Sequence, residues 1–545
     1  MRSPYLVPDF LFGQSIALVL AKTFLAGLLA IVPLSCREGG GTAPSITSQP
    51  SSQTVTAGQA ATFTVGASGT APLSYQWRRS GSDISGATST SCTTPTTTSA
   101  DNGATFTVRV SNTAGFVDSQ AATLTVTGPG PTISFTQDTV GSRANLVPNG
   151  AWWGENISKI VHHGSKTFTF VIDANVTPTK AFLYSKSADG AWTEGEGFEV
   201  SRPPNLLVDS DGVIHLIGFA PFDAADKGGR LFHVKFAVSG TVSGTYFKEF
   251  ISEDWRPIPT TATYATYFVG AAIGADDTIA VAYNNSVQYD TPNTHTLGFR
   301  VWNPQSQIWS YETVAENMVS RHCYPFAFVS PDFFHVYAVE DDHDTDYAAL
   351  GEPYASYQFR YGMVKHFQRP RSGGGWVETT LLNFNGIPGI SKAQIWNAIL
   401  RIIDFHVDAV GTVHALLRYK GTFNGSTLEA STANKAYHYW KAEGSTIWNN
   451  EEILPSQDLY WARIWERSDG KLFFIGQTWR EQLWVIPHGE TTKYIASSLY
   501  GDDVADPTPF ISSLRGGTDL STSFKAVVFS GKYTVPAKSL DVSVD

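Results

Sequence analysis

The sequence predicts an all-β protein in which an N-terminal immunoglobulin-like sandwich is followed by a seven-bladed β-propeller. The composition is typical of turns and strands, with 48 Gly, 28 Pro, 13% aromatic residues and only 16% charged residues. A stretch rich in Thr and Ser precedes residue 128 and alternates apolar with polar residues. After residue 150, one strand–turn–strand pattern recurs seven times. Blocks of ~40–50 residues with four strands each are typical of propeller blades.

The first 36 residues have the features of an export signal. Residues 16–34 are strongly apolar and lead to Ser35 and Cys36, and a polar, Gly-rich spacer follows over residues 37–43. The arrangement resembles a bacterial lipoprotein signal peptide, which implies cleavage before Cys36 and a lipid on that cysteine. A plain secretory signal and a single membrane anchor are the alternatives. We therefore expect an exported protein, either an outer-membrane or cell-surface lipoprotein or a secreted one.

Residues 44–127 form a separate unit in which Trp77 suits the buried tryptophan of an immunoglobulin-like sandwich. The unit resembles bacterial I-set domains at Asp101–Gly103 and Ser111–Gly115. Val65 and Val108 stand where antibody domains carry paired cysteines, so packing alone must hold the sheets together. We expect a spacer module, joined by a short stiff linker at residues 128–131. The predicted strands are Gln53–Ala57, Ala61–Val65, Leu73–Trp77, Thr105–Val110 and Ala121–Val126.

Residues 132–545 contain the predicted propeller. Its last blade has only three predicted strands, Ile511–Leu514, Phe524–Phe529 and Leu540–Val544. The run Thr132–Thr139 has no partner in the first blade, so we predict that it supplies the missing strand and removes the last open edge. The inner segments of the blades begin near Ile160, Leu206, Ala271, Phe326, Phe405, Ile464 and Leu514.

Charge and cysteine usage exclude several classes of function. The net charge of −11 argues against a nucleic-acid binder. The three cysteines, Cys36, Cys92 and Cys323, have no paired spacing, so no disulfide framework is predicted. No nucleotide-binding or zinc-binding motif is present. We expect no cofactor, membrane contact only through the N-terminal lipid or anchor, and a monomer.

One face of the predicted propeller gathers arginine and aromatic residues. The loops that enter inner strands and the loops that leave second strands share this face, called the mouth below. Aromatic rings stack on sugars, and the arginine fork pairs with carboxylates or sulfates. A single aromatic residue at a strand end more often packs between blades, but the cluster favours a site. The substrate-binding candidates are Arg202, Tyr264, Tyr267, Trp396, Asn397, Arg418, Tyr419, Tyr460, Trp461, Trp479 and Arg480, and the catalytic candidates are Arg321, His322 and Tyr324.

Two other groups of polar residues suggest different roles. His215 and His414 follow similar turns at the same offset on the opposite face, and this recurrence predicts a structural role. The stretch Glu340–Asp346 is rich in carboxylates. We expect a solvated acidic loop there, with calcium binding at Asp341–Asp346 as the alternative.

The repeats resemble BNR-type propellers, a group that includes ulvan-degrading and related polysaccharide lyases. The segments that carry the resemblance are IVHHGSKTF, PNLLVDSDGVIHL and HCYPFAFVSPDFFHVY. The resemblance implies cleavage of a uronic-acid glycan by β-elimination, with an acidic polysaccharide as partner. One motif departs from the pattern. Those lyases often carry Asp-Asp-His-Asn before an inner-strand proline, whereas residues 200–204 read VSRPP, so that catalytic histidine is not carried over.

β-Elimination needs a cation beside the uronate carboxylate, a base for the C5 proton and an acid for the leaving oxygen. Arg321 or Arg202 suits the first role, and His322 or Tyr324 suits the proton transfers. Two other functions stay open: a non-catalytic surface glycan-binding or adhesion protein, and a glycoside hydrolase. A hydrolase needs two carboxylates at the mouth, for which the candidates are Asp223, Asp290 and Asp341.

Overall fold

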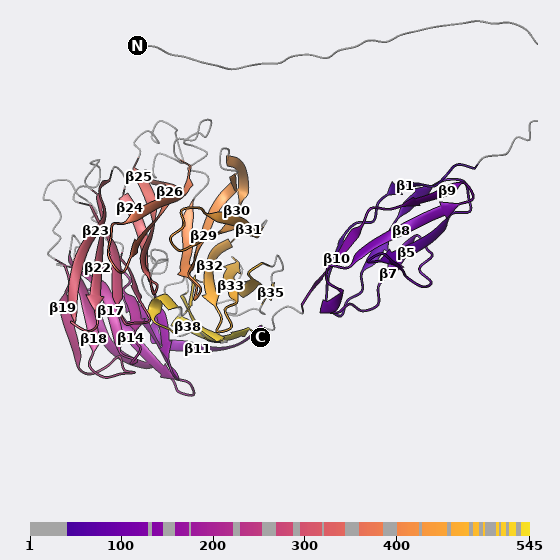
Figure 1. Ribbon diagram of the computed structural model, residues 1–545. Helices are drawn as coiled ribbons and strands as arrows, with labels where there is room; N and C mark the ends of the chain where they lie inside the picture. The colour runs from indigo at the N-terminus through magenta and orange to yellow at the C-terminus, as the bar shows by residue number, and fades with distance from the viewer. Residues whose placement is uncertain are drawn as a thin grey trace, which may run out of the picture. The chain divides into compact units, whose positions relative to one another are not determined.

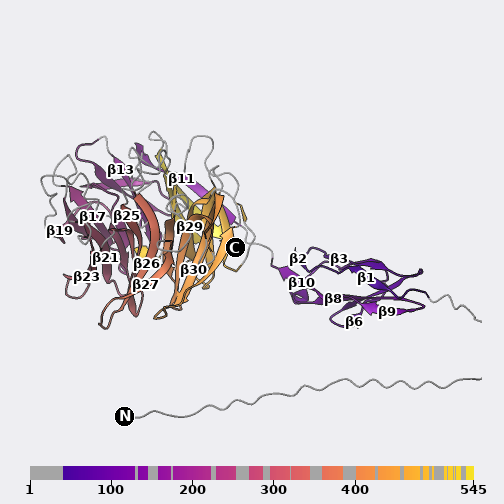
Figure 2. The same cartoon turned by 90° about the horizontal axis from the view of Figure 1, so that it is seen from above.

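The described part of the computed structural model consists mainly of strands, and it contains no helix long and apolar enough to cross a membrane. The chain divides into two compact units, Met1–Gly130 and Pro131–Asp545 (Figure 1, Figure 2). The described residues are 41–128, 133–144, 158–173, 176–221, 229–252, 269–286, 295–318, 321–343, 359–384, 400–423, 428–454, 459–478, 483–489, 494–495, 508–511, 514–518, 521, 523–529 and 536–544.

The N-terminal unit is a sandwich of short strands around one apolar core. Trp77 is fully buried, and its indole N–H donates to the Ser89 carbonyl at 2.9 Å. Phe63 stacks on Phe106 with ring centroids 4.3 Å apart. Val108 is also fully buried, so apolar packing occupies the predicted cysteine position. The strands are β1 (Ser45–Ser48), β2 (Gln53–Thr56), β3 (Thr62–Thr64), β4 (Gly66–Ser68), β5 (Ser74–Arg79), β6 (Ser82–Asp83), β7 (Ser91–Thr93), β8 (Thr105–Asn112), β9 (Gly115–Asp118) and β10 (Ala122–Thr127).

The described strands of the C-terminal unit form seven four-stranded antiparallel sheets, the blades of the propeller. In chain order, the first four are β12 (Ile160–His163), β13 (Lys166–Asp173), β14 (Lys180–Ser187), β15 (Thr193–Glu199); β16 (Asn205–Val208), β17 (Ile214–Pro221), β18 (Gly229–Phe236), β19 (Tyr246–Phe250); β20 (Val269–Ile273), β21 (Ile279–Ser286), β22 (His295–Asn303), β23 (Ile308–Met318); and β24 (Arg321–Val329), β25 (Phe333–His343), β26 (Phe359–Pro370), β27 (Val377–Asn383). The last three are β28 (Arg401–Val407), β29 (Thr412–Phe423), β30 (Leu428–Ala442), β31 (Asn449–Leu454); β32 (Leu459–Glu466), β33 (Leu472–Thr478), β34 (Leu483–Pro487), β35 (Tyr494–Ile495); and β36 (Thr508–Ile511), β37 (Ser523–Phe529), β38 (Pro536–Val544) with β11 (Ile133–Ala144).

The two ends of the propeller chain close the ring in one blade. Strand β11 pairs with β38 in an antiparallel register that runs from Ile133 opposite Val544 to Thr139 opposite Lys538. The predicted pairing of Thr132–Thr139 with Leu540–Val544 is therefore confirmed from Ile133 onward, and Thr132 lies outside the described residues. First strands of successive blades are neighbours, and β36 contacts β12. Figure 1 shows the labelled strands following one another around a common centre.

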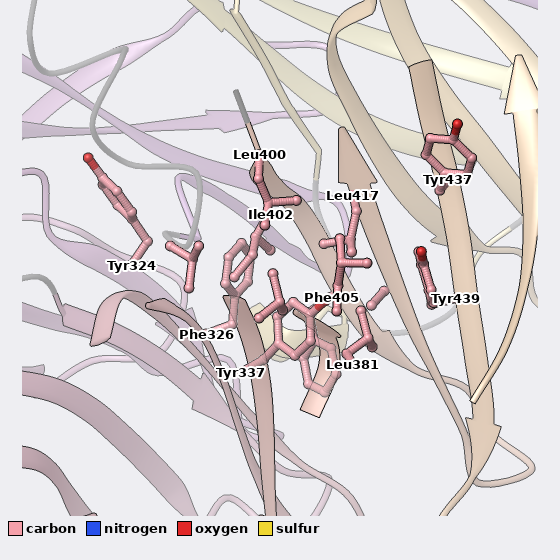
Figure 3. Close-up of a cluster of buried hydrophobic side chains, with 14 of the residues drawn as sticks. Tyr324, Phe326, Tyr337, Leu381, Leu400, Ile402, Phe405, Leu417, Tyr437 and Tyr439 are labelled. Atoms are coloured by element: carbon pink, nitrogen blue, oxygen red, sulfur yellow. The ribbon is translucent and has the colours of Figure 1, made fainter. Parts of the chain in front are cut away.

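Apolar residues on both faces of the blades form the core between them. Strand β17 is buried along nearly its whole length, as expected for a sheet covered on both sides. Between the fourth and fifth blades, Tyr337 stacks on Phe405 with ring centroids 5.0 Å apart. Figure 3 shows this cluster, to which Leu381 and Leu417 also belong. Interlocked side chains of this kind hold adjacent blades in register.

The inner segment of the seventh blade differs from the prediction. Strand β36 ends at Ile511, and Leu514 begins a short 3-10 helix, η5 (Leu514–Gly516), instead of ending a strand. Gly517 follows in the left-handed region at φ +84°. Consecutive glycines let this turn fold against the first strands β16, β20 and β24. The turn between β36 and β37 thus reaches into the centre of the ring.

Candidate functional site

Tyr324 adopts an unusual backbone conformation where β24 begins. Its φ is +49°, in the left-handed region, and the β24–β25 register shifts between Cys323 and Phe326. Pro325 has no N–H to donate to β25, which favours a break in the ladder at this point. Such strained residues cost of order 1–3 kcal/mol and cluster at functional sites. Figure 3 shows the Tyr324 hydroxyl directed away from the cluster around Phe326 and Tyr337.

The centre of the ring contains buried charges that the sequence did not reveal. Arg515 of η5 is 5% exposed, and its Nη1 lies 3.7 Å from Asp404 Oδ1. Its guanidinium also lies over the Phe326 ring, 4.9 Å from the centroid. Among the described residues, Nε and Nη1 of Arg515 have no hydrogen-bond partner. A buried cation with two unsatisfied donors is costly unless an anion approaches it.

A second arginine adds to this positive charge. Arg463 is 3% exposed, and its Nη1 donates to the Ile403 carbonyl. The carboxylate of Asp404 accepts from the Ile464 N–H at 2.9 Å. Burial lowers the pKa of Arg515 to about 10, with Asp404 opposing this decrease and Arg463 adding to it. Among the described residues, the two guanidinium groups and the Asp404 carboxylate give this central cluster a net positive charge.

Three predicted mouth residues other than Tyr324 have described side chains. Arg202 is partly buried, and its Nη1 donates to the Ser201 carbonyl at 3.0 Å. Arg418 is also partly buried, in the mouth-side half of β29. Tyr419 is 1% exposed and stacks on Tyr437 with centroids 4.2 Å apart. Burial, together with Tyr439, raises the pKa of Tyr419. Tyr419 therefore packs inside a blade interface, which corrects its predicted role as a sugar contact.

The other predicted residues are located in part or not at all. The backbones of Arg321 and His322 open β24, and those of Tyr460 and Trp461 lie in β32. The acidic stretch begins in a strand and not in a loop, because β25 continues to His343. Outside the described residues lie Cys36, Tyr264, Tyr267, Trp396, Asn397, Trp479, Arg480 and Asp344–Asp346.

Histidine pairs cross the blades at the end opposite the mouth. In the second blade, His215 Nδ1 lies 2.9 Å from His233 Nε2, and His215 Nε2 lies 3.3 Å from Asp209 Oδ2. His233 Nδ1 lies 3.1 Å from Glu249 Oε1, which also accepts from the Trp309 indole N–H at 2.9 Å. His215 is fully buried. These contacts connect the side chains of β17, β18 and β19 across the blade. They agree with the structural role predicted for His215.

The fourth blade has a related pair, and among the described residues no second carboxylate lies at its end. His335 Nδ1 lies 3.1 Å from His366 Nε2, and His335 Nε2 lies 2.7 Å from Glu443 Oε1 of the fifth blade. Both histidines are fully buried. Burial lowers the pKa of His335, with Glu443 opposing, and lowers the pKa of His366 well below its ordinary value.

We predict that this pair makes the propeller sensitive to acid. Unfolded His366 takes up a proton as pH falls through about 6.5, whereas the folded residue does not. Stability is therefore complete above pH ~6.5 and declines below it, by at most about 1.4 kcal/mol per pH unit for this residue. Urea unfolding at pH 7.5, 6.5 and 5.5 measures the slope. His366→Gln should reduce the slope by the share of this residue, and equal slopes in both proteins would contradict the prediction.

Comparisons with known proteins support the fold of the N-terminal unit. Residues 43–113 match the family model described as an immunoglobulin domain. No curated protein sequence matches the chain. Similar solved structures include the Ig1-2 module of the Drosophila receptor protein tyrosine phosphatase DLAR, at 16% identity and a TM-score of 0.15, covering 29% of this chain and 98% of that one. The SapL1 lectin in complex with alpha methyl fucoside has 11% identity, a TM-score of 0.32 and coverages of 65% and 99%. The WD40 domain of SCAP from fission yeast has 10% identity, a TM-score of 0.32 and coverages of 75% and 98%.

Proposed function

We propose that the propeller binds an acidic polysaccharide at its mouth and cleaves uronic-acid linkages by β-elimination. The observation that carries the proposal is the left-handed Tyr324 at the start of β24, a strained residue with a hydroxyl directed away from the core. Arg321 and His322 lie three and two residues before it in the same strand. A cation, a base and an acid are the three groups that this reaction requires.

The roles follow from the chemistry of each side chain. His322 removes the C5 proton, the electron pair forms the C4–C5 double bond, and the C4–O bond breaks. The Tyr324 hydroxyl gives its proton to the leaving oxygen. Arg321 or Arg202 neutralises the uronate carboxylate, which makes the C5 proton more acidic. The positive charge of Arg515 and Arg463 at the centre of the ring favours the approach of an anionic chain in an otherwise acidic protein.

A non-catalytic glycan-binding protein is the second candidate. Residues 200–204 lack the Asp-Asp-His-Asn stretch of the lyases that the repeats resemble, and Tyr324 is only 8% exposed. In either case we propose that the protein is exported, with a lipid on Cys36 as anchor. The immunoglobulin-like unit then acts as a spacer between the membrane and the propeller.

A panel of uronate glycans tests the proposal. The intact protein should release products that absorb ultraviolet light through their C4–C5 double bond. Arg321→Ala should weaken glycan binding by about tenfold to a hundredfold, because a charge-assisted hydrogen bond contributes ~1.5–3 kcal/mol. Binding without unsaturated product would favour the non-catalytic candidate. Failure to bind any acidic glycan would refute both.

A further inference from the structure

The fifth blade has a line of hydrogen-bonded side chains, carboxylate–His–His–carboxylate, that closely matches the one in the second blade. We call such a line a histidine row. His414 Nδ1 lies 2.9 Å from His438 Nε2, and His414 Nε2 lies 3.2 Å from Asp408 Oδ2. His438 Nδ1 lies 3.0 Å from Glu451 Oε1. His414 is 2% exposed and His438 is fully buried, so the row crosses the blade from β29 through β30 to β31 inside the protein.

A third histidine completes a cluster at the outer end of this row. His488 follows β34 of the sixth blade, and its Nε2 lies 3.4 Å from Glu451 Oε1. One ligand atom from each of His438, Glu451 and His488 lies within 4.8 Å of the others. The His438 and His488 rings are nearly perpendicular, at 86°. The Glu451 and His488 side chains are 38% and 36% exposed, which leaves the cluster open to solvent on one side.

We propose that His438, Glu451 and His488 bind a divalent transition-metal ion, with Zn²⁺ as the preferred ion. Zinc binds histidine nitrogen and carboxylate oxygen at ~2.0–2.2 Å, and tetrahedral geometry then places neighbouring ligand atoms about 3.3 Å apart. Two of the three separations here, 3.0 and 3.4 Å, already match this spacing. Three protein ligands and an open side leave a fourth position for water.

The buried part of the row supplies the support that metal-binding histidines use. A metal-ligating histidine usually donates the N–H of its other ring nitrogen to a hydrogen-bond partner. This hydrogen bond fixes the tautomer and the orientation of the ring. His438 does so through His414, which Asp408 in turn orients. The row has three polar contacts, but two neutral imidazoles offer only two N–H donors. When His414 donates to Asp408 and His438 donates to His414, both N–H groups are used. The Nδ1 lone pair of His438 then faces Glu451, and a cation fits between them.

The second blade provides an internal comparison. Glu249 ends its row as Glu451 does, but its third neighbour is Trp309, an N–H donor with no lone pair for a metal. Among the described residues, only the fifth-blade row therefore ends beside a third side chain that can bind a metal ion. The site lies at the end opposite Tyr324, so it does not depend on the proposed glycan chemistry.

Titration calorimetry of the untagged, chelator-treated full chain with ZnCl₂ tests the site. We expect one zinc ion per chain, and Co²⁺ in its place should give the visible absorption of a tetrahedral site. His488→Gln should weaken zinc binding by at least tenfold while leaving the melting temperature of the metal-free protein unchanged, because His488 is partly exposed. Glu451→Gln should weaken binding similarly.

The matched control is Glu249→Gln, which changes the equivalent carboxylate in the second blade. Zinc affinity should stay at the parental value in that variant. The proposal is overturned if the parent binds no zinc, if His488→Gln binds as the parent does, or if Glu249→Gln lowers affinity as much as Glu451→Gln. A binding experiment of this kind is also independent of any enzymatic assay.

Discussion

Replacing Gly517 with alanine should destabilise the propeller by about 3–5 kcal/mol, because two costs add at one position. The residue has a φ of +84°, which an L side chain rarely adopts. An added Cβ would also lie 1.9 Å from the Val208 carbonyl oxygen and 2.7 Å from Ile273 Cγ2. The backbone of β16 is in the way, so a side-chain rotation cannot relieve the clash. The turn that carries Arg515 would have to leave the centre of the ring.

Gly470→Ala is the matched control. It lies in a turn of the sixth blade at φ +79°, with nothing within 4 Å of an added Cβ. It should therefore show only the conformational cost, about 1–2 kcal/mol. Urea unfolding of the two variants and the parent measures both effects. Equal losses would mean that the turn after η5 does not pack against β16 and β20.

The repeats predicted the blades well because each blade buries a continuous apolar strand pair. The first two strands of the second blade, β16 and β17, lie where the pattern around Leu206 placed them. Ring closure by β11 was also predictable, because the sequence contained one strand without a partner and one blade that lacked a strand. Their pairing removes an open sheet edge. In the N-terminal unit the periodic strands were found, whereas short strands such as β7 were not. A strand of two to four residues contains little alternation, so only some of them, such as β2 and β3, were recognised.

The candidate site was less predictable. The strand order shows which loops share a face of the propeller, but it does not show which side chains contact one another. Turns between first and second strands were expected on the face opposite the mouth, whereas the turn that carries Arg515 folds into the centre of the ring. The consecutive Gly516 and Gly517 are the only hint of this in the turn itself, and Gly228–Gly229 and Gly373–Gly375 are similar runs elsewhere in the sequence. Tyr419 illustrates the opposite case, where an aromatic residue at the correct strand end is buried against Tyr437. The partners of His438 come from two blades, so spacing along the chain could not reveal that cluster.

Replacing Tyr324 with phenylalanine should lower turnover of a uronate substrate by about 10²–10⁴-fold, the range for loss of a general acid. The ring and its packing remain, so the unfolding free energy and glycan affinity should change little. Steady-state kinetics on the substrate that gives ultraviolet-absorbing product measures kcat and KM. We expect the loss in kcat, because the hydroxyl acts on the leaving oxygen in the transition state and not in substrate binding.

Tyr337→Phe separates this chemical role from a general effect of removing a buried hydroxyl. Tyr337 belongs to the same apolar cluster, and its hydroxyl has no hydrogen-bond partner among the described residues. Its removal should leave kcat unchanged and should maintain or raise stability, because an unsatisfied buried hydroxyl costs about 1–3 kcal/mol. If Tyr324→Phe turns over substrate like the parent, Tyr324 is not the acid, and its left-handed backbone serves only the bulge in β24. If both variants lose turnover equally, the cluster as a whole, and not the Tyr324 hydroxyl, supports the site.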